Sequence, residues 1–466
     1  MTRGLEEAFR YVDDSQERFI ADLVELCRQP SVSTSGEGMA EMPEALTRML
    51  GRYGFSVRVI PTGGYPIVYG EIDVGADRTL LCYKHYDVQP PDPLHQWDSP
   101  PFEPTLRDGK LYARGVADVK GGIASFLHAV DALRQGVGSI GVNLKFLIEG
   151  EEEVASRHLE EAVLGNKDLF SADVCIWENA FKDHQDRPMI RIGNKGMCYL
   201  ELRARNLRID HHSRWAAVLP SSAWDLVWAL SSLKDRQEHV LVDGFYDGVR
   251  PVTPDEQRVL ESLAMDAEPL KRESGASHLL NGAEGGRLAE MLYTRPTCNI
   301  AGMVAGYTGE GSKTVLPAEA VAKLDLRLVP DQDPVDIYNK VKRHLEERGF
   351  AGIEVRMLSA TWPSKTPVSH PFVQLVLKAG EMAYGVQPVV EITSAGSGPR
   401  YVFSQWTDMP MVALGVGYAG SQNHAPNENI RIKDYLEGVK HLAATLYLYS
   451  RALTPHGEVR DSETGG

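Results

Sequence analysis

The sequence has few cysteines, no long apolar run and no excess of basic charge. Its 466 residues include five cysteines, an odd and small number that argues against a disulfide framework and predicts buried free thiols in a reducing compartment. No apolar run approaches the roughly 20 residues that a membrane-spanning helix needs. The formal net charge of -15 argues against a nucleic-acid partner, because surfaces that bind phosphate backbones are usually basic.

The beginning of the chain also lacks a recognisable signal peptide. Residues 1–9 do not contain the apolar core of a signal peptide and continue into an amphipathic helical pattern. We therefore expect a cytoplasmic protein without a membrane partner. A chain of 466 residues is too long for one ordinary domain, so we expect two or three, each with a core of its own.

Strand-like and helix-like segments alternate at both ends of the chain. This alternation is typical of an α/β domain with a mostly parallel sheet and helices on both faces. In the middle, two helices and an antiparallel set of strands predict an inserted α+β module. We predict a discontinuous first domain of residues 1–195 and 367–454, an inserted domain of residues 196–366 and a flexible tail of residues 455–466. The first helix is predicted over residues 5–28, and strands over residues 79–83, 142–148, 172–177 and 411–416.

His85 and Asp87 come just after the apolar run of residues 79–83. Residues two apart on an extended segment point the same way. An imidazole beside a carboxylate suits a metal ligand and the group that orients it. A His and an Asp near a turn are also ordinary loop residues, so this interpretation needs support from other parts of the chain.

That support comes from further ligand-type residues in connections that follow a strand or open a helix. Three consecutive carboxylates, at positions 151–153, leave the strand of residues 142–148. Such a run is usually a solvated surface, but open α/β sheets bind ligands at the carboxyl ends of their strands. Five nitrogen and oxygen ligands at one sheet edge can converge on a shared site. They are His85, Asp118, Glu153, Glu178 and His424.

Several segments, in order along nearly the whole chain, resemble the M20 family of metallopeptidases. That family includes carnosinase-like dipeptidases, carboxypeptidases, aminoacylases and deacetylases. Each segment alone is a weak signal, but the set is specific. The segments are His85-Tyr-Asp-Val-Gln-Pro, Trp97-Asp-Ser-Pro-Pro-Phe-Glu-Pro, Asp108-Gly-Lys-Leu-Tyr-Ala-Arg-Gly-Val-Ala-Asp-Val-Lys-Gly, Glu149-Gly-Glu-Glu-Glu and His424-Ala-Pro-Asn-Glu.

The resemblance implies a catalytic first domain with two divalent ions, Zn²⁺ before Mn²⁺ or Co²⁺. Asp87 would hydrogen-bond the far nitrogen of His85. Glu152 would be the general base, although the residues alone do not settle which of Glu151, Glu152 and Glu153 is base and which is ligand. The implied ligands are His85, Asp118 and Glu178 for one ion and Asp118, Glu153 and His424 for the other.

Amide hydrolysis requires ligands and a base of these kinds. Three carboxylates and a bridging hydroxide balance the charge of two divalent ions. Coordination lowers the pKa of water from about 15.7 to about 7, which makes a nucleophile available at neutral pH. Glu152 would take the proton of that water and return it to the departing amine.

The inserted module resembles the lid and dimerisation domain of the family. Arg327 lies in a strand whose leucines alternate with polar residues, so it faces away from the core. A solvated arginine is the ordinary interpretation, and the resemblance makes it the clamp for a substrate carboxylate. His212, otherwise a surface histidine, would reach the scissile carbonyl across a homodimer. Thr314 and Ser397 align with substrate-contacting positions.

Three departures from the family pattern weaken the dipeptidase prediction but leave the hydrolase prediction intact. Lys84 replaces a glycine and puts a cation beside the site, Glu178 stands where many dipeptidases have Asp, and no Gly pair follows His212. We predict a hydrolase that cleaves an amide bond in dipeptides or similar small substrates with a free C-terminal carboxylate. The alternatives are an N-acyl-amino-acid deacylase of the same family and a non-catalytic metal-binding relative.

Overall fold

The computed structural model describes residues 2–458, which form two compact units. The first unit takes residues up to 193, residues 366–392 and residues from 402 onward. The second takes residues 194–365 and also residues 393–401, which the sequence pattern places in the first domain. Of the predicted tail, residues 459–466 lie outside the described chain. Within residues 455–458, the main-chain oxygen of Glu458 accepts a hydrogen bond of 2.6 Å from Leu453 N.

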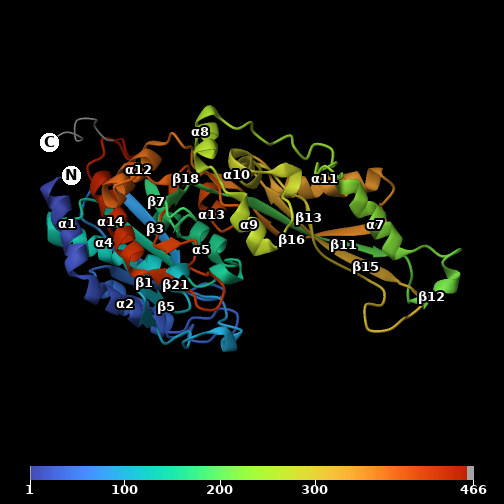
Figure 1. The fold of residues 1–466 in the computed structure, drawn as a ribbon, viewed down its shortest axis with the longest axis horizontal. Helices are drawn as coiled ribbons and strands as arrows, with labels where there is room; N and C mark the ends of the chain where they lie inside the picture. The colour runs from blue at the N-terminus through green and yellow to red at the C-terminus, as the bar shows by residue number, and fades with distance from the viewer. Residues whose placement is uncertain (1, 459–466) are drawn as a thin grey trace. The chain divides into compact units, whose positions relative to one another are not determined.

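An eight-stranded sheet with the order β1-β2-β6-β3-β7-β19-β9-β18 is the frame of the first unit (Figure 1). β3 pairs in parallel with β6 and β7, and β19 pairs in parallel with β7. The carboxyl ends of these four strands therefore meet at one edge. The strands are β1 (Ser56–Ile60), β2 (Ile67–Ile72), β3 (Thr79–His85), β6 (Asn143–Glu149), β7 (Val174–Trp177), β9 (Met189–Arg191), β18 (Val389–Glu391) and β19 (Met411–Ala413).

Helices packed on this sheet complete an α/β fold. α4 is buried on nearly every side over its first three turns, which a helix enclosed within a domain requires. It contacts α1 and α14, and α14 contacts α12. The helices are α1 (Arg3–Asp14), α2 (Gln16–Arg28), α3 (Met42–Arg52), α4 (Gly121–Val137), α5 (Leu159–Gly165), α6 (Lys167–Phe170), α12 (Pro371–Tyr384), α13 (Tyr401–Ser404) and α14 (Ile432–Tyr449).

Two element boundaries differ from the sequence prediction. The single helix predicted over residues 5–28 is two helices, because the chain leaves helical geometry at Ser15. Two aspartates and this serine stand together there, and their side chains compete with the helix for backbone groups. β3 extends to His85, which is therefore the last residue of the strand and does not follow it.

The second unit is an α+β module. Its sheet has the order β13-β15-β11-β16, and all neighbouring pairs are antiparallel. α7 and α11 pack on the sheet and close a core of leucine, valine and alanine side chains. The principal elements are β11 (Gly196–Arg205), β12 (His211–His212), α7 (Ser222–Leu233), α8 (Pro254–Leu263), α9 (Ala267–Ser274), α10 (Gly285–Thr294), β13 (Asn299–Ala305), β14 (Val315–Leu316), β15 (Glu319–Leu328), α11 (Pro334–Glu347) and β16 (Ile353–Thr361).

Two general properties complete the description. Within residues 2–458, no helix combines the length and the apolar character needed to cross a bilayer. All five cysteines are buried, and none is in a disulfide.

Candidate metal centre

The parallel strands bring three acidic or imidazole-bearing segments to one edge. His85 ends β3, and it stands in register with Glu149, the last residue of β6. Glu178 directly follows β7, the other neighbour of β3. Because adjacent parallel strands end at the same edge, residues far apart in the sequence meet here.

Asp118 lies between two imidazoles. It belongs to the turn Val116–Lys120, which leads into α4. Its Oδ1 is 3.3 Å from His85 Nε2, and its Oδ2 is 3.1 Å from His424 Nε2. A carboxylate that faces two imidazoles with different oxygens has the arrangement that a bridging metal ligand needs.

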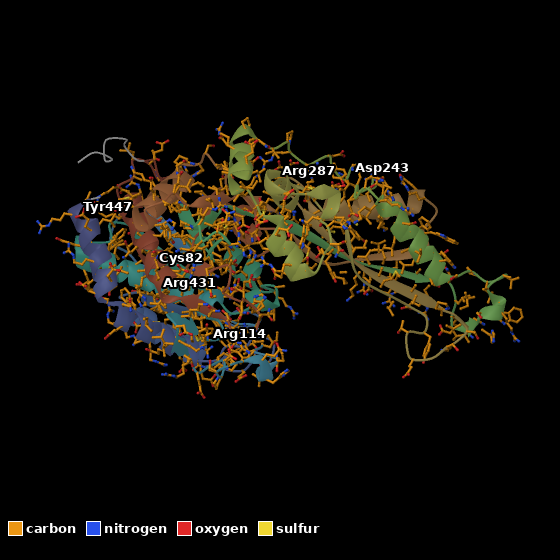
Figure 2. The ribbon with its side chains drawn as sticks, viewed as in Figure 1. Cys82, Arg114, Asp243, Arg287, Arg431 and Tyr447 are labelled. Carbon is orange, nitrogen blue, oxygen red and sulfur yellow. The ribbon has the colours of Figure 1, made fainter. Side chains whose placement is uncertain are left out.

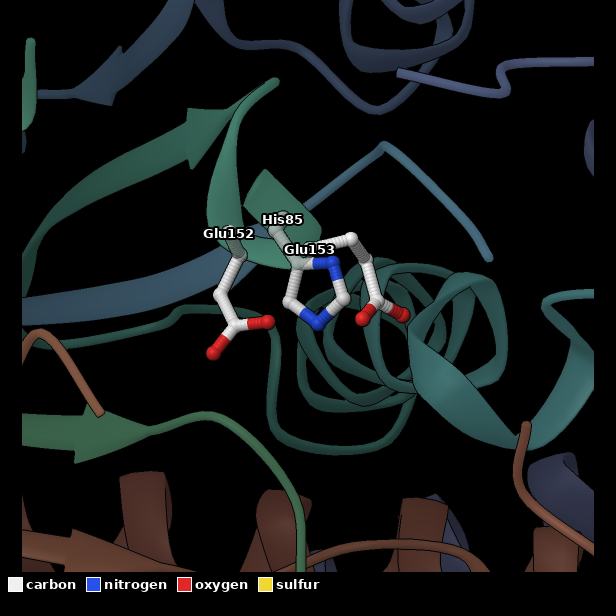
Figure 3. A group of neighbouring side chains, drawn as sticks. All are labelled: His85, Glu152 and Glu153. Carbon is white, nitrogen blue, oxygen red and sulfur yellow. The ribbon is translucent and has the colours of Figure 1, made fainter. Parts of the chain in front are cut away.

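Glu152 and Glu153 begin a short 3-10 turn after β6. Glu153 Oε1 is 3.3 Å from His424 Nε2. Figure 3 shows the carboxylates of Glu152 and Glu153 on either side of the His85 ring. Two groups of three side chains have their ligand atoms within 4.8 Å of one another, and they share Glu153: His85, Glu152 and Glu153, and Asp118, Glu153 and His424.

Glu178 belongs to neither of these groups. It is close enough that the charges of His85 and Asp118 act on its pKa. Its Oε1 is buried and has no hydrogen-bond partner among the described residues. A carboxylate oxygen buried without a donor is costly unless a cation or a proton meets it, so the position fits a metal ligand.

Asp87 contacts His85 through its side chain, as the sequence predicts, and also through its backbone. Its main-chain oxygen lies 3.0 Å from His85 Nδ1, whereas its carboxylate Oδ1 is 3.5 Å away. The carboxylate accepts hydrogen bonds from the main-chain nitrogens of Glu152 and Glu153, at 3.1 and 3.0 Å. Asp87 therefore orients the imidazole mainly through its backbone and fixes the glutamate turn with its side chain.

The structure separates Glu151 from its two neighbours. Glu151 Oε2 is 2.7 Å from His158 Nδ1, and Glu151 is in neither ligand group. Glu149 accepts hydrogen bonds from Tyr83 and from Ser156 Oγ. The sequence did not predict the roles of Tyr83, Ser156 and His158, because only the fold brings these side chains to the two glutamates.

Lys84 puts a cation beside the site, as the sequence predicts. It is buried, and its Nζ lies 3.3 Å from the main-chain oxygen of Trp177. Burial lowers the pKa of its ammonium group. Its Nζ thus donates to the end of β7, next to Glu178, and its charge opposes the rise in the pKa of that carboxyl group.

The pKa values show how crowded the negative charge is. Burial raises the pKa of Glu152, and the nearby charge of Glu178 raises it further. Burial alone would raise the pKa of Asp118 too, but hydrogen bonds from His424 and His85 hold it well below its usual value. Hydrogen bonds to Asp118 and Glu153 raise the pKa of His424 to about 10. Such a cluster takes up protons unless cations replace them, which is the behaviour of a metal site.

The predicted substrate residues lie in the second unit. Arg327 Nη1 donates a 3.0 Å hydrogen bond to Ser397 Oγ, and its Nε is 2.9 Å from Asp325 Oδ1. Arg327 faces away from the core, as the alternation along β15 predicts. His212 is exposed, and its Nδ1 accepts a 3.1 Å hydrogen bond from Arg214 N. Thr314 is also exposed, and its main-chain oxygen accepts a 3.1 Å hydrogen bond from Ser213 N, the residue after His212.

Comparisons with known proteins extend over nearly the whole chain. The model of peptidase family M20/M25/M40 matches residues 81–448. A Beta-Ala-His dipeptidase of Rattus norvegicus is 29% identical, covering 94% of this chain and 94% of that protein. A Cys-Gly metallodipeptidase of Schizosaccharomyces pombe is 26% identical, covering 94% and 97%. The crystal structure of an M20 family metallo-carboxypeptidase from Sulfolobus solfataricus is 38% identical, with a TM-score of 0.86 and coverage of 93% and 99%.

Proposed function

The chain belongs to peptidase family M20/M25/M40 and is a hydrolase, and on that premise we propose that it cleaves the amide bond of dipeptides or similar small substrates with a free C-terminal carboxylate. The observation that carries the proposal is the pair of ligand groups joined by Glu153. The names of the dipeptidase relatives support the substrate class.

We assign the ligands of two divalent ions to this edge of the sheet. His85, Asp118 and Glu178 would hold one, and Asp118, Glu153 and His424 the other, with Zn²⁺ preferred over Mn²⁺ or Co²⁺. When bound, the ions would supply Lewis-acid activation of water and of the scissile carbonyl. The nitrogen and oxygen donors support this assignment, as do two buried carboxylate oxygens, Glu153 Oε1 and Glu178 Oε1, that have no hydrogen-bond partner among the described residues.

Glu152 is the proposed general base. Burial and the charge of Glu178 raise its pKa, so that its carboxylate binds a proton more tightly than an exposed glutamate does. It takes the proton of the attacking water on a carboxylate oxygen and delivers it to the nitrogen of the leaving amine. The hydrogen bond from Glu152 N to Asp87 Oδ1 holds the backbone in place during both transfers.

The second unit would bind the substrate. Arg327 would clamp its terminal carboxylate, with Ser397 and Thr314 as further contacts, and His212 would act across a homodimer. An exposed apolar surface supports the dimer: Trp224 and Trp228 of α7 are 57% and 52% exposed, and the edge strand β13 is exposed along most of its length. The five free thiols support a place in the reducing cytoplasm.

A Glu152→Gln variant tests the proposal. It should bind both ions and lose about 10²- to 10⁴-fold in turnover, since it cannot accept the proton. Glu160→Gln, an exposed glutamate of α5, is the matched control and should keep full activity. Metal content by mass spectrometry and turnover on a dipeptide panel are the two measurements. Unchanged turnover of Glu152→Gln, or fewer than about two ions per wild-type chain, contradicts the proposal.

A deacylase is the second candidate, favoured by Glu178 at a position where many family dipeptidases have Asp. A metal-supplemented screen of free dipeptides against N-acyl amino acids distinguishes the two. Activity on acyl substrates alone would replace the dipeptidase proposal with the deacylase.

A further inference from the structure

Glu428 ends the segment His424-Ala-Pro-Asn-Glu and has no part in the proposed chemistry. It is only 1% exposed. The next residues form β21 (Asn429–Arg431), which pairs antiparallel with β5 (Lys110–Tyr112). This pairing carries Glu428 to the segment that leads into Asp118, and Ala113 N donates a 3.1 Å hydrogen bond to its main-chain oxygen.

The carboxylate of Glu428 is held by four donors. Its Oε2 accepts hydrogen bonds of 2.8 Å from both Arg114 Nη1 and Gly115 N. Its Oε1 accepts hydrogen bonds of 2.8 and 3.0 Å from Ala117 N and Asp118 N. Arg114 is labelled in Figure 2. Both oxygens accept hydrogen bonds from N–H groups, three of them on the main chain. The carboxylate therefore holds the backbone in place and has no oxygen left to bind an ion.

The backbone that Glu428 holds has little freedom of its own. Gly115 has φ of +81°, and a Cβ there would approach Val88 Cγ1 to 2.5 Å. Asn179 Nδ2 donates a 2.6 Å hydrogen bond to Ala117 O. The segment is therefore fixed from several sides, and Glu428 accepts hydrogen bonds from three of its main-chain nitrogens, those of Gly115, Ala117 and Asp118.

The residue that follows Glu428 closes the loop that carries His424. Asn429 N, the next main-chain nitrogen, donates a 2.9 Å hydrogen bond to Ser421 O across the base of that loop. Within the loop, His424 has φ of +60°, a conformation that a non-glycine residue keeps only when its surroundings impose it. One residue thus connects the loop of His424 with the backbone of Asp118.

We propose that Glu428 is a positioning residue of the metal centre, which holds the Asp118 backbone against the His424 loop and so sets the spacing of the two ligands. The spacing in question is the 3.1 Å between His424 Nε2 and Asp118 Oδ2. This inference rests on the proposed function, in which both side chains bind the same ion. Supporting groups of this kind typically change metal affinity by about 10- to 100-fold when they are replaced.

The test is metal binding by Glu428→Gln, which keeps the size of the side chain but turns an N–H group towards N–H donors. Titration calorimetry with Co²⁺ should show about 10- to 100-fold weaker binding at one site or both. The visible spectrum of the Co²⁺ protein should change as well, since it reports ligand geometry. Asp173→Asn is the matched control: the Asp173 carboxylate also accepts a hydrogen bond from a main-chain nitrogen, that of Thr79 at 2.8 Å, but at the opposite end of β3 from His85.

The outcomes separate a positioning role from a merely structural one. A change of affinity and spectrum in Glu428→Gln but not in Asp173→Asn supports the proposal. Wild-type affinity in a folded Glu428→Gln protein overturns it, and so does an equal loss in both variants. A wild-type protein that binds no ion overturns the proposed function and this inference together, whereas the other results bear on the inference alone.

Amide hydrogen exchange in the wild-type, metal-free protein decides the matter if Glu428→Gln does not fold. The amides of Gly115, Ala117 and Asp118 should be protected, and added Co²⁺ should slow their exchange further. Exchange of these amides at the rate of an unstructured chain, or protection that does not change with Co²⁺, contradicts the proposal.

Discussion

The two units of the chain expose their functional side chains in different ways. In the first, the candidate ligands lie at the ends of parallel strands and are held by buried partners, as His85 is by the backbone of Asp87. In the second, His212 and the aromatic face of α7 are exposed, and Arg327 is held by side chains alone. We infer that the first unit determines whether chemistry occurs and that the second tunes substrate choice and assembly. The predictions that follow test this division.

The largest effect is expected for Asp118→Asn. An amide cannot give both ions a negatively charged oxygen, so the protein should lose at least one ion per chain. Because a bound ion contributes several kcal/mol to the transition state, activity should fall by at least about 10³-fold. Metal analysis measures the loss of ions, and turnover measures the loss of activity. The control is Asp131→Asn, which changes a carboxylate of α4 that is remote from the ligands. Full metal content in the Asp118→Asn variant would show that Asp118 does not bridge the two ions.

A second prediction concerns the stability of the first unit. His441 is buried on α14, and its Nε2 lies 2.9 Å from Val376 O. Burial lowers the pKa of His441 to about 4, although the hydrogen bond to Val376 opposes this. An unfolded histidine has a pKa of about 6.5. As the pH falls from about 6.5 to about 4, His441 binds a proton in the unfolded chain but not in the folded one. The free energy of unfolding should therefore fall by about 3 kcal/mol.

Urea unfolding of the metal-free protein at pH 7 and pH 4.5 measures this loss. A His441→Gln variant should lose stability less steeply over the same range, whereas His184→Gln, an exposed histidine of the same unit, should keep the full slope. Equal slopes for the wild type and His441→Gln would show that His441 does not cause the acid sensitivity.

The contrast between the units also explains what the sequence could predict. Apolar runs located β3, β6 and β7, and the rule that parallel strands end at one edge brought His85, Asp118 and His424 together. Period-two alternation placed Arg327 correctly on the outer face of β15. The residues alone could not assign the different roles of positions 151–153, because no sequence pattern announces the pairing of Glu151 with His158 or the left-handed turn at Ala155.

The third prediction addresses the exposed face of the second unit. If α7 lies in a homodimer interface, Trp228→Ala removes a large aromatic side chain and should weaken the dimer by about 30-fold in Kd. Analytical ultracentrifugation across a concentration series measures the change. Leu270→Ala, which alters an exposed leucine on α9, should leave the dimer intact. An unchanged sedimentation profile for Trp228→Ala would place the interface elsewhere or leave a monomer.

The smallest effect separates the shape of Arg327 from its charge. Lysine keeps the positive charge of Arg327 but not the planar fork that binds a carboxylate through two parallel hydrogen bonds. Arg327→Lys should therefore raise the KM for dipeptides about tenfold, the equivalent of one hydrogen bond of about 1.4 kcal/mol, while kcat changes little. Arg203→Lys is the matched control, because Arg203 is a half-exposed arginine of the same sheet that pairs with Glu201 and Glu319. A fall in kcat without a change in KM would instead assign Arg327 to the chemical step, and the division between the two units would then fail.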